Sequence, residues 1–361
     1  MKIALVHDYL NQYGGAERVL QALCSMFPQA PIYAAVYDRN ATGGVFHGRE
    51  VRTSFLQNIP LVKRYHHAFS PLMPLAFEQF DLSAFDVVFS VAASFAKGII
   101  TKPHTRHICY CLTPPRFLWD DSQRYVQEFA YPRIFKSLVP PLLSYLRIWD
   151  RQAAVRVDEF IAISDFVRQR ISKYYRRDAH VIYPPVQISR FYLAGRIDEY
   201  YLMVGRLVTY KRFDAAVRVF TELGWPLKIV GTGVEYVRLK RIAGPNIEFL
   251  GLVSDDRLAD LYAHARAVVF PQEEDFGIVP LEAMASGRPV IAYRGGGAIE
   301  TIIKETGVFF DEQTDESLRN ALLQFDHMRF NPHVCRTQAE KFDISIFKEK
   351  VLNVLKTETN S

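Results

Sequence analysis

Residues 273–287, EEDFGIVPLEAMASG, have the pattern of a loop that leads into a helix, and they lie between short apolar runs at 267–270 and 289–292. Pro280 suits the first turn of a helix, where no N–H is needed, and Gly287 suits its end. A strand, a helix and a second strand in this order form the repeating unit of a parallel sheet. We therefore expect an α/β fold here, with the 273–277 loop at the carboxyl edge of the sheet, where such folds bind ligands.

The same alternation of apolar runs and helical patterns extends in both directions from this stretch. In the second half of the chain, the pattern predicts strands at 200–204, 227–230, 247–250 and 307–309 and helices at 212–223, 254–264 and 342–355. In the first half it predicts strands at 2–7, 86–91, 106–111 and 159–163 and helices at 16–26 and from Ser164. A break at Tyr183-Pro184-Pro185 and an irregular stretch to about 198 separate the halves. We expect two α/β domains whose sheets face a central cleft.

The composition is that of an ordinary globular protein. The 361 residues exceed one domain of about 150, and 49% apolar with 23% charged residues exclude disordered and fibrous classes. The four cysteines have no zinc-site spacing and are expected to be reduced thiols. Asp8 interrupts the N-terminal segment before the apolar core of a signal peptide could form, so no signal peptide is expected. The longest uncharged run, 19–37, contains prolines, so no membrane span is expected and the expected location is cytoplasmic.

Charge is uneven along the chain. Residues 1–190 contain 23 Lys and Arg but 15 Asp and Glu, whereas the net charge of the whole chain is +5. A basic half suggests an anionic partner such as a phosphorylated substrate, a nucleic acid or a membrane surface, and the alternative is a solvated basic surface.

Three segments could carry chemistry. The first, 11–17, places Gly14 and Gly15 between a strand and a helix, where helix N–H groups can meet an anion, or where an ordinary turn lies. The second, VGRLVTYKR at 204–212, puts Arg206 and Lys211 directly after a strand. Two cations at this position favour binding of a diphosphate over the alternative, two solvent-exposed surface charges.

The third segment is the 273–287 stretch itself. Glu274 and Glu282 are separated by a loop and a helix start, so one carboxylate can face a sugar ring and the other a ribose. The backbone N–H groups of Gly277, Ile278 and Val279 would point into the cleft. The alternative, a capped acidic loop, does not account for the whole pattern.

This third segment resembles the nucleotide-binding signature of retaining glycosyltransferases of family 4, which have the GT-B fold. The resemblance covers nearly the whole chain, including VGRLVTYKRFD, FLGLVSDDRLADLYAHARAVVFP and EEDFGIVPLEAMASGRPVIAYRGGGAIET. The pieces AKGIITKP, CYCLTPPRFLWD and LRIWDRQAAVRVD are similar to bacterial O-antigen and exopolysaccharide mannosyltransferases. The resemblance implies two Rossmann-like domains: 1–186 on the acceptor side, 199–340 for the nucleotide sugar, and 341–361 as a helix that crosses back to the first domain.

The resemblance also implies roles. Arg206 and Lys211 match the pair that stabilises the leaving diphosphate, so no metal and no cofactor is expected, and the nucleotide sugar is a substrate. Glu274 matches the carboxylate at the donor sugar and joins them as the catalytic set, whereas Glu282 matches the ribose carboxylate. The remaining members of the donor-binding set are Gly14, Gly15, Phe276, Gly277, Ile278 and Val279. The implied reaction is front-face attack, helped by the leaving phosphate, with no covalent nucleophile.

Other candidates carry weaker signals. Asp8 could face the cleft or hold a turn, and His7 and His107 are expected to be structural. Ser164 and Asp165 have the pattern of a helix cap. Among residues 113–120, Arg116 and Asp120 could line the acceptor side, while Phe117 and Trp119 are expected to pack. The apolar, cation-studded stretch 131–147 could dock on lipid or form a buried helix pair.

These observations predict a hexosyltransferase that adds mannose from GDP-mannose to a lipid-linked or growing surface glycan, peripheral on the inner face of the plasma membrane and without a nucleic-acid partner. One departure from the resembled subgroup bears on the donor: Leu112 stands where that subgroup usually has a histidine, which could favour a 6-deoxyhexose such as rhamnose. The alternatives are a nucleotide-sugar epimerase or hydrolase on the same fold and a non-catalytic sugar-nucleotide-binding protein.

Overall fold

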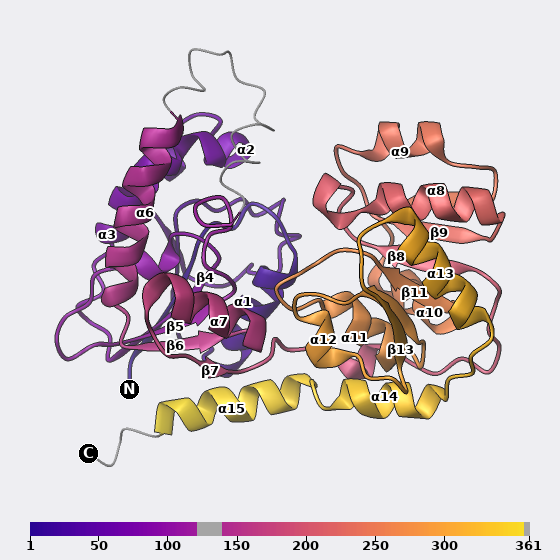
Figure 1. The fold of residues 1–361 in the computed structure, drawn as a ribbon. Coiled ribbons are helices and arrows are strands. Elements are labelled where there is room, and N and C mark those ends of the chain that lie inside the picture. The colour runs from indigo at the N-terminus through magenta and orange to yellow at the C-terminus, as the bar shows by residue number, and fades with distance from the viewer. Residues whose placement is uncertain (121–138, 357–361) are drawn as a thin grey trace. The chain divides into compact units, whose positions relative to one another are not determined.

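The chain folds into two compact units, each built on one parallel sheet (Figure 1). The computed structural model describes residues 1–120 and 139–356. The first unit is Met1–Tyr183 and the second is Pro184–Ser361, so the division falls close to the expected end of the first domain at 186. The irregular stretch up to 198 belongs to the second unit.

The first unit contains a seven-stranded sheet in the order β3-β2-β1-β4-β5-β6-β7. Its strands are β1 Ile3–His7, β2 Ile32–Ala34, β3 Val51–Thr53, β4 Val87–Ala92, β5 Arg106–Cys111, β6 Glu159–Ala162 and β7 His180–Val181. Its helices are α1 Gly15–Met26, α2 Val62–Tyr65, α3 Met73–Glu78, α6 Val139–Val155 and α7 Asp165–Tyr175, with 3-10 turns at Phe55–Asn58, His66–Leu72 and Ala96–Gly98. Every residue of β4 is buried, as expected for a central strand covered by helices on both faces.

The second unit contains a six-stranded sheet in the order β10-β9-β8-β11-β12-β13. Its strands are β8 Tyr201–Val204, β9 Leu227–Val230, β10 Ile247–Gly251, β11 Ala267–Phe270, β12 Val290–Tyr293 and β13 Gly307–Phe310. Its helices are α8 Phe213–Leu223, α9 Tyr236–Ile242, α10 Asp255–His264, α11 Ile278–Ala285, α12 Ala298–Thr301, α13 Asp315–Asp326, α14 Pro332–Glu340 and α15 Ile344–Lys356, with 3-10 turns at Ile188–Arg190 and Thr209–Lys211. Because all six strands are parallel, their carboxyl ends share one edge of the sheet.

The core of the second unit forms between this sheet and the helices α8 and α13. Helix α8 buries Phe213, Val217 and Phe220 at helical spacing, and these side chains pack against Tyr201 and Leu322 in one cluster. The helices α8, α9 and α13 lie together above the sheet, and α11 and α14 lie below it (Figure 1). The sheet edge that carries the candidate residues is therefore held between two packed layers.

The expected strands agree with the observed ones to within one or two residues, whereas three strands of the first sheet were not expected. These are β2, β3 and β7, which are only two or three residues long. The last expected helix, 342–355, is α15 and begins at Ile344. Its crossing to the first domain stays a prediction. No helix in residues 1–120 and 139–356 is long and apolar enough to span a bilayer.

Candidate functional site

Two loops at the carboxyl edge of the second sheet hold the candidate residues. One follows β8 and carries Arg206 and Lys211, and the other follows β11 and carries Glu274. The strand order places β8 beside β11, so the two loops are neighbours although they are far apart in sequence. Ligands of parallel sheets bind at this edge.

Lys211 and Glu274 form an ion pair between these loops. The Lys211 Nζ lies 2.7 Å from the Glu274 Oε1, and both side chains are largely buried. The Gln272 side-chain amide also donates to Glu274 Oε1 at 3.2 Å, so the carboxylate has two partners. The ammonium group is thus held at the strand ends with its charge balanced by a carboxylate, in a place where a phosphate could compete for it.

Gly205 is required for this arrangement of Lys211. Its φ is 152°, which side chains rarely adopt, and a Cβ at this position would lie 3.0 Å from the Lys211 Nζ. The lysine chain therefore lies across the glycine. Arg206, the next residue, is exposed and makes no side-chain hydrogen bond or ion pair with any residue that the structure describes. An exposed guanidinium close in sequence to a held ammonium is a pair of cations of the kind that a diphosphate would need.

Glu282 lies on α11 with its side chain buried. Its Oε2 accepts a hydrogen bond of 2.8 Å from the hydroxyl of Tyr262 on α10, which fixes the carboxylate. Tyr262 was not predicted as part of the site, because nothing in the sequence signals that its hydroxyl faces a carboxylate. Whether Glu282 binds a ribose stays a prediction.

The N-terminus of α11 supplies backbone donors. The helix begins at Ile278, so the N–H groups of Ile278 and Val279 have no acceptor within the helix, while Pro280 has no N–H. Gly277 precedes them with φ 88°, in the left-handed region that favours glycine, and a Cβ there would lie 3.1 Å from the Phe270 ring. The amide donors expected at 278 and 279 are thus placed at the helix start, as anion sites need.

A loop of three glycines after β12, residues 295–297, packs against the loop that carries Glu274. The Gly297 N–H donates to the Glu274 carbonyl at 2.9 Å. A Cβ at Gly296 would lie 2.1 Å from that carbonyl oxygen, and one at Gly297 would lie 2.4 Å from the Phe276 Cα. The GGG run formed part of the resemblance without a role assigned to it, and its function here is close packing against residues 274–276.

Gly14 and Gly15 belong to the first unit. The Gly14 N–H donates to the Glu17 Oε2 at 2.7 Å, so this amide already has an acceptor within the unit. Burial acts to raise the pKa of Glu17, but the hydrogen bond and charge of His7 and the backbone N–H groups of Glu17 and Gly14 outweigh it and lower that pKa. The expected contact of Gly14 and Gly15 with a donor phosphate stays a prediction.

Asp8 holds a turn. Its two carboxylate oxygens accept backbone N–H groups from each of Ala93, Ser94, Phe95 and Ala96, at 2.6 to 2.9 Å, and its side chain is buried. Four N–H donors satisfy a carboxylate, so the turn-holding alternative describes Asp8.

Most of the other first-unit candidates make contacts within the unit. Ser164 caps α7 by accepting the Val167 N–H, Trp119 stacks on Tyr174 with centroids 4.9 Å apart, and Phe117 packs near Phe95. His7 contacts Glu17 and His107 contacts Ser90, both in the interior. Asp120 pairs with Arg170 and accepts the Tyr174 hydroxyl, and the acceptor-side roles of Arg116 and Asp120 stay predictions.

Of the stretch 131–147, residues 131–138 lie outside the described residues and 139–147 form the first half of α6. This helix buries Leu143 and Leu146 and exposes Tyr145 and Ile148. The described part is therefore a packed helix with an exposed apolar face, which leaves lipid docking a prediction. In the described part of the chain no three His, Cys, Asp or Glu side chains gather as a metal site would need, and the metal requirement of the reaction stays a prediction as well.

Comparisons with known proteins cover the chain from residue 13 to residue 342. A sequence model described as Glycosyltransferase Family 4 matches residues 13–190, and one described as Glycosyl transferases group 1 matches residues 190–342. An O-antigen chain mannosyltransferase, RfbU of Salmonella typhimurium, is 27% identical over 64% of this chain and 67% of its own length. An uncharacterized glycosyltransferase of Methanocaldococcus jannaschii is 28% identical over 49% of this chain. The chain spans 52% of that archaeal relative, about half of its length.

Solved structures resemble the whole chain. HepE of Anabaena, solved in complex with UDP, has a TM-score of 0.75 at 17% identity and covers 99% of this chain and 100% of its own. A sucrose-phosphate synthase from Thermosynechococcus elongatus has a TM-score of 0.71 at 16% identity, covering 99% of this chain and 98% of its own. At these identities the likeness concerns the fold.

Proposed function

The chain belongs to the family 4 glycosyltransferases and has their GT-B fold, and from this we propose that it transfers mannose from GDP-mannose to a lipid-linked or growing surface glycan, with retention of the anomeric configuration. The observation that carries the proposal is the Lys211–Glu274 pair at the strand ends, with exposed Arg206 beside it. These groups have the chemistry that a nucleotide diphosphate sugar requires.

Each group has a task in the proposed reaction. Arg206 and Lys211 bind the diphosphate and stabilise the negative charge that grows on it as the bond to the anomeric carbon breaks. The N–H groups of Ile278 and Val279 lie at the start of α11 and add donors for oxygen atoms of the donor. Glu274 exchanges its contact with Lys211 for hydroxyls of the sugar, and Glu282 binds the ribose. Binding of the donor therefore replaces an internal ion pair by two contacts with substrate.

The proposed chemistry is a front-face substitution. The acceptor hydroxyl attacks the anomeric carbon from the side on which the phosphate leaves, and its proton passes to an oxygen of that phosphate. The carbon–oxygen bond to the phosphate breaks, the new glycosidic bond forms, and the nucleoside diphosphate departs. Two protein cations neutralise the leaving group, so the proposal needs no divalent metal and no covalent intermediate.

Support for mannose comes from relatives. RfbU is named as an O-antigen chain mannosyltransferase, and ALG2 of Candida glabrata, 24% identical over 54% of this chain and 57% of its own length, is named as an alpha-1,3/1,6-mannosyltransferase. A second donor class is a 6-deoxyhexose. Leu112 follows β5 half-buried, and a leucine cannot bond a C6 hydroxyl but can pack against a methyl group.

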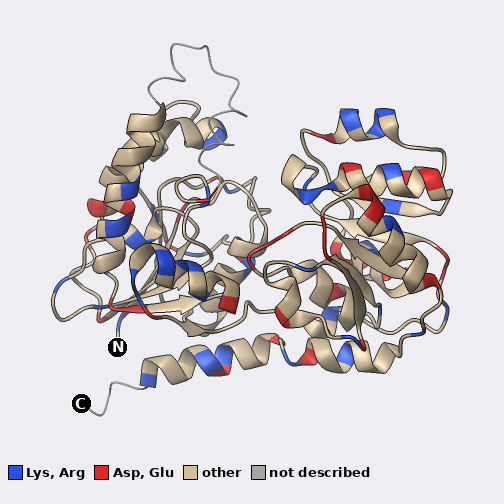
Figure 2. Ribbon diagram, in the orientation of Figure 1, with Lys and Arg blue, Asp and Glu red and all other residues tan. Residues whose placement is uncertain are grey.

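The proposed location is the cytoplasmic face of the plasma membrane, near a lipid-linked acceptor. In the first unit, α6 has two arginines, and α7 has two arginines and a lysine (Figure 2). On α6 the exposed side chains of Tyr145 and Ile148 lie close in sequence to Arg151. Apolar side chains beside cations are the chemistry of attachment to an anionic bilayer.

The experiment is a thermal-shift panel followed by turnover. Purified protein is heated with GDP-mannose, its 6-deoxy counterpart GDP-rhamnose and UDP-glucose, and a ligand at one hundred times its Kd should add about 2.7 kcal/mol to the native state. We expect GDP-mannose to give the largest shift, and Leu112→His to favour the 6-hydroxylated donor further. A shift from UDP-glucose alone would overturn the proposed donor. Stabilisation without turnover on any glycan acceptor would favour a non-catalytic binding protein, and free sugar or an epimer as product would favour the hydrolase or epimerase.

A further inference from the structure

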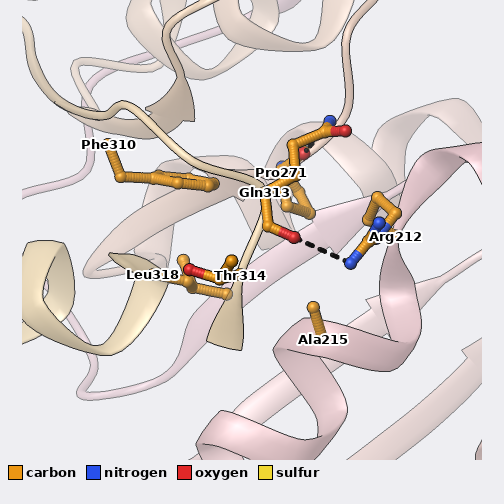
Figure 3. A pocket seen from close by; sticks show the side chains of 7 residues that line it. All are labelled: Arg212, Ala215, Pro271, Phe310, Gln313, Thr314 and Leu318. Atoms are coloured by element: carbon orange, nitrogen blue, oxygen red, sulfur yellow. Dashed lines mark hydrogen bonds between the residues drawn. The ribbon is translucent and has the colours of Figure 1, made fainter. Parts of the chain in front are cut away.

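Two residues outside the expected site join three of the loops at the carboxyl edge of the second sheet (Figure 3). Arg212, in the loop after β8, donates from Nη2 to the main-chain carbonyl of Gln313 at 2.8 Å. Gln313, in the loop after β13, donates from its side-chain amide to the carbonyl of Pro271 at 3.0 Å. Pro271 opens the loop after β11, so the contacts run in sequence from β8 through β13 to β11.

These contacts begin and end beside the Lys211–Glu274 pair. Arg212 follows Lys211 directly in the chain, and Pro271 starts the loop that carries Glu274. One residue, Gln313, therefore contacts both loops that carry the pair. In the part of the chain that the structure describes, Gln313 makes no hydrogen bond with Lys211 or Glu274. A displacement of the 311–314 loop would move the backbone next to Lys211 and the backbone before Glu274 together.

The backbone of Arg212 has an unusual conformation. Its φ is 55°, in the left-handed region that residues other than glycine rarely adopt. This residue lies directly after the 3-10 turn Thr209–Lys211 and directly before α8. Such a conformation persists only where surrounding contacts hold it. The Arg212 N–H donates to the Thr209 carbonyl at 3.1 Å, and the guanidinium reaches the Gln313 carbonyl across the sheet edge. In Figure 3 the Arg212 side chain reaches the main-chain carbonyl of Gln313, and Pro271 and Phe310 are among the residues that line the small pocket beside this contact.

We propose that Gln313 is a positioning residue for donor binding, which sets the spacing of Lys211 and Glu274 through its contacts with Arg212 and Pro271. The inference rests on the proposed function, because it assigns Gln313 to the same diphosphate site. Loss of the amide donor at 313 would leave the Pro271 carbonyl without this partner and free the 271–274 loop to shift, so the diphosphate would meet a lysine and a carboxylate at the wrong separation.

The chain offers a matched control two residues away. Asp315 makes a two-point contact with Arg218 on α8, with Nε–Oδ2 at 2.6 Å and Nη2–Oδ1 at 2.8 Å. This pair joins the start of α13 to α8, and its hydrogen bonds do not involve the loops after β8 and β11. Arg218, with a smaller contribution from the charge of Arg212, lowers the pKa of Asp315. Asp315→Asn therefore removes a negative charge from the same neighbourhood but leaves both hydrogen bonds of Gln313 in place.

The test compares Gln313→Glu with Asp315→Asn in the full chain by titration calorimetry with GDP, and with UDP in parallel. Glutamate has the size of glutamine but cannot donate to the Pro271 carbonyl. We expect Gln313→Glu to raise the Kd at least about fivefold while the stoichiometry stays that of the wild type, since a displaced cation loses part of a charge-assisted contact. Asp315→Asn should lower Tm only slightly and leave the Kd within about twofold of the wild type, because a partly exposed ion pair contributes little and the hydrogen bonds of this one lie between α8 and α13.

A merely structural role gives a different result, namely a lower stoichiometry at unchanged Kd, and that outcome overturns the proposal. Hydrogen exchange in the ligand-free protein supplies an independent readout. Gln313→Glu removes the bond to Pro271 but keeps the main-chain carbonyl that Arg212 contacts, so the peptide covering 271–277 should exchange faster, and the peptide covering 208–213 should follow it because the 311–314 loop shifts. Both peptides should exchange as in the wild type in Asp315→Asn. If the wild type binds neither GDP nor UDP, the proposed function fails, whereas the exchange experiment still decides whether Gln313 holds the two loops. Equal exchange in both variants would overturn the inference.

Discussion

Arg206 is the side chain whose removal most directly reports on the proposed diphosphate site, because it is exposed and supports no other contact in the described structure. Arg206→Ala should therefore leave Tm unchanged and lower kcat/KM by about two orders of magnitude, which corresponds to the loss of one preorganised donor at a developing charge. Steady-state kinetics of the folded variant measure this effect.

The control is Arg294→Ala, which removes another exposed arginine at the same sheet edge. Arg294 follows β12 and pairs with Asp311 rather than lying free. Its removal should change kcat/KM less than about twofold. Equal losses in both variants would mean that general positive charge, rather than Arg206, attracts the donor.

Buried His107 should make the free energy of unfolding depend on pH. Burial, with the charge of Arg156 adding to it, lowers the pKa of His107 to about 3. Between the unfolded value near 6.5 and pH 3, the unfolded chain takes up a proton that the folded chain refuses, so stability falls as the pH falls through this window, by at most about 1.4 kcal/mol per pH unit.

His107→Gln removes this titration while keeping a side chain that can bond Ser90. We expect the variant to be less stable than the wild type at pH 8, and its Tm to fall less steeply between pH 6.5 and 4.5. Thermal unfolding at a series of pH values tests this. Parallel pH profiles for the two proteins would show that the folded protein already accepts the proton at His107.

The loop after β12 acts as a support element. Gly297→Ala places a Cβ about where the Phe276 backbone lies, 2.4 Å from its Cα, so the 274–276 loop must shift. We expect kcat/KM to fall by an order of magnitude or more, roughly what a displacement of catalytic groups by 1 Å costs. Gly195→Ala is the control, because a Cβ there meets nothing within 4 Å. If both variants keep wild-type kinetics, the glycine loop does not set the position of Glu274.

Helix α6 carries the membrane prediction. Tyr145 and Ile148 are 54% and 67% exposed, and replacing both by serine should reduce recovery on anionic vesicles in a flotation assay. Binding should also weaken as salt rises, because cations of the first unit contribute to it. The matched control replaces the exposed Val234 and Val237 of the second unit by serine. Equal recovery on neutral and anionic vesicles contradicts the electrostatic part of the prediction.

The elements that were predicted well are those whose signals are local. The strand Arg106–Cys111 and the strand Ala267–Phe270 are apolar runs bounded by turns, and the Ser164 cap is read from one residue. The Lys211–Glu274 pair could not be predicted in the same way, because it depends on β8 lying beside β11 in the sheet and on a glycine that lets the lysine chain cross. Tyr262 and Gln313 gave no sequence signal, since their contacts come from helices and loops that meet only in the folded unit.

The residues expected to contact the donor are distributed over both units of the chain. The second unit contains the cations, the two carboxylates and the helix start, whereas Gly14 and Gly15 lie in the first. Each unit has its own parallel sheet, and the proposed donor-binding residues of the second unit lie at one edge of its sheet. We therefore expect a nucleoside diphosphate to bind mainly through the second unit.

We propose that two protein cations, with no metal ion, stabilise the leaving diphosphate of a transferred sugar. The most direct test is transfer from GDP-mannose to a glycan acceptor in excess EDTA, with the anomeric configuration of the product determined by NMR. We expect the rate in EDTA to equal the rate without it and the product to keep the α configuration of the donor. Loss of transfer in EDTA that magnesium or manganese restores, or a β-linked product, would contradict it.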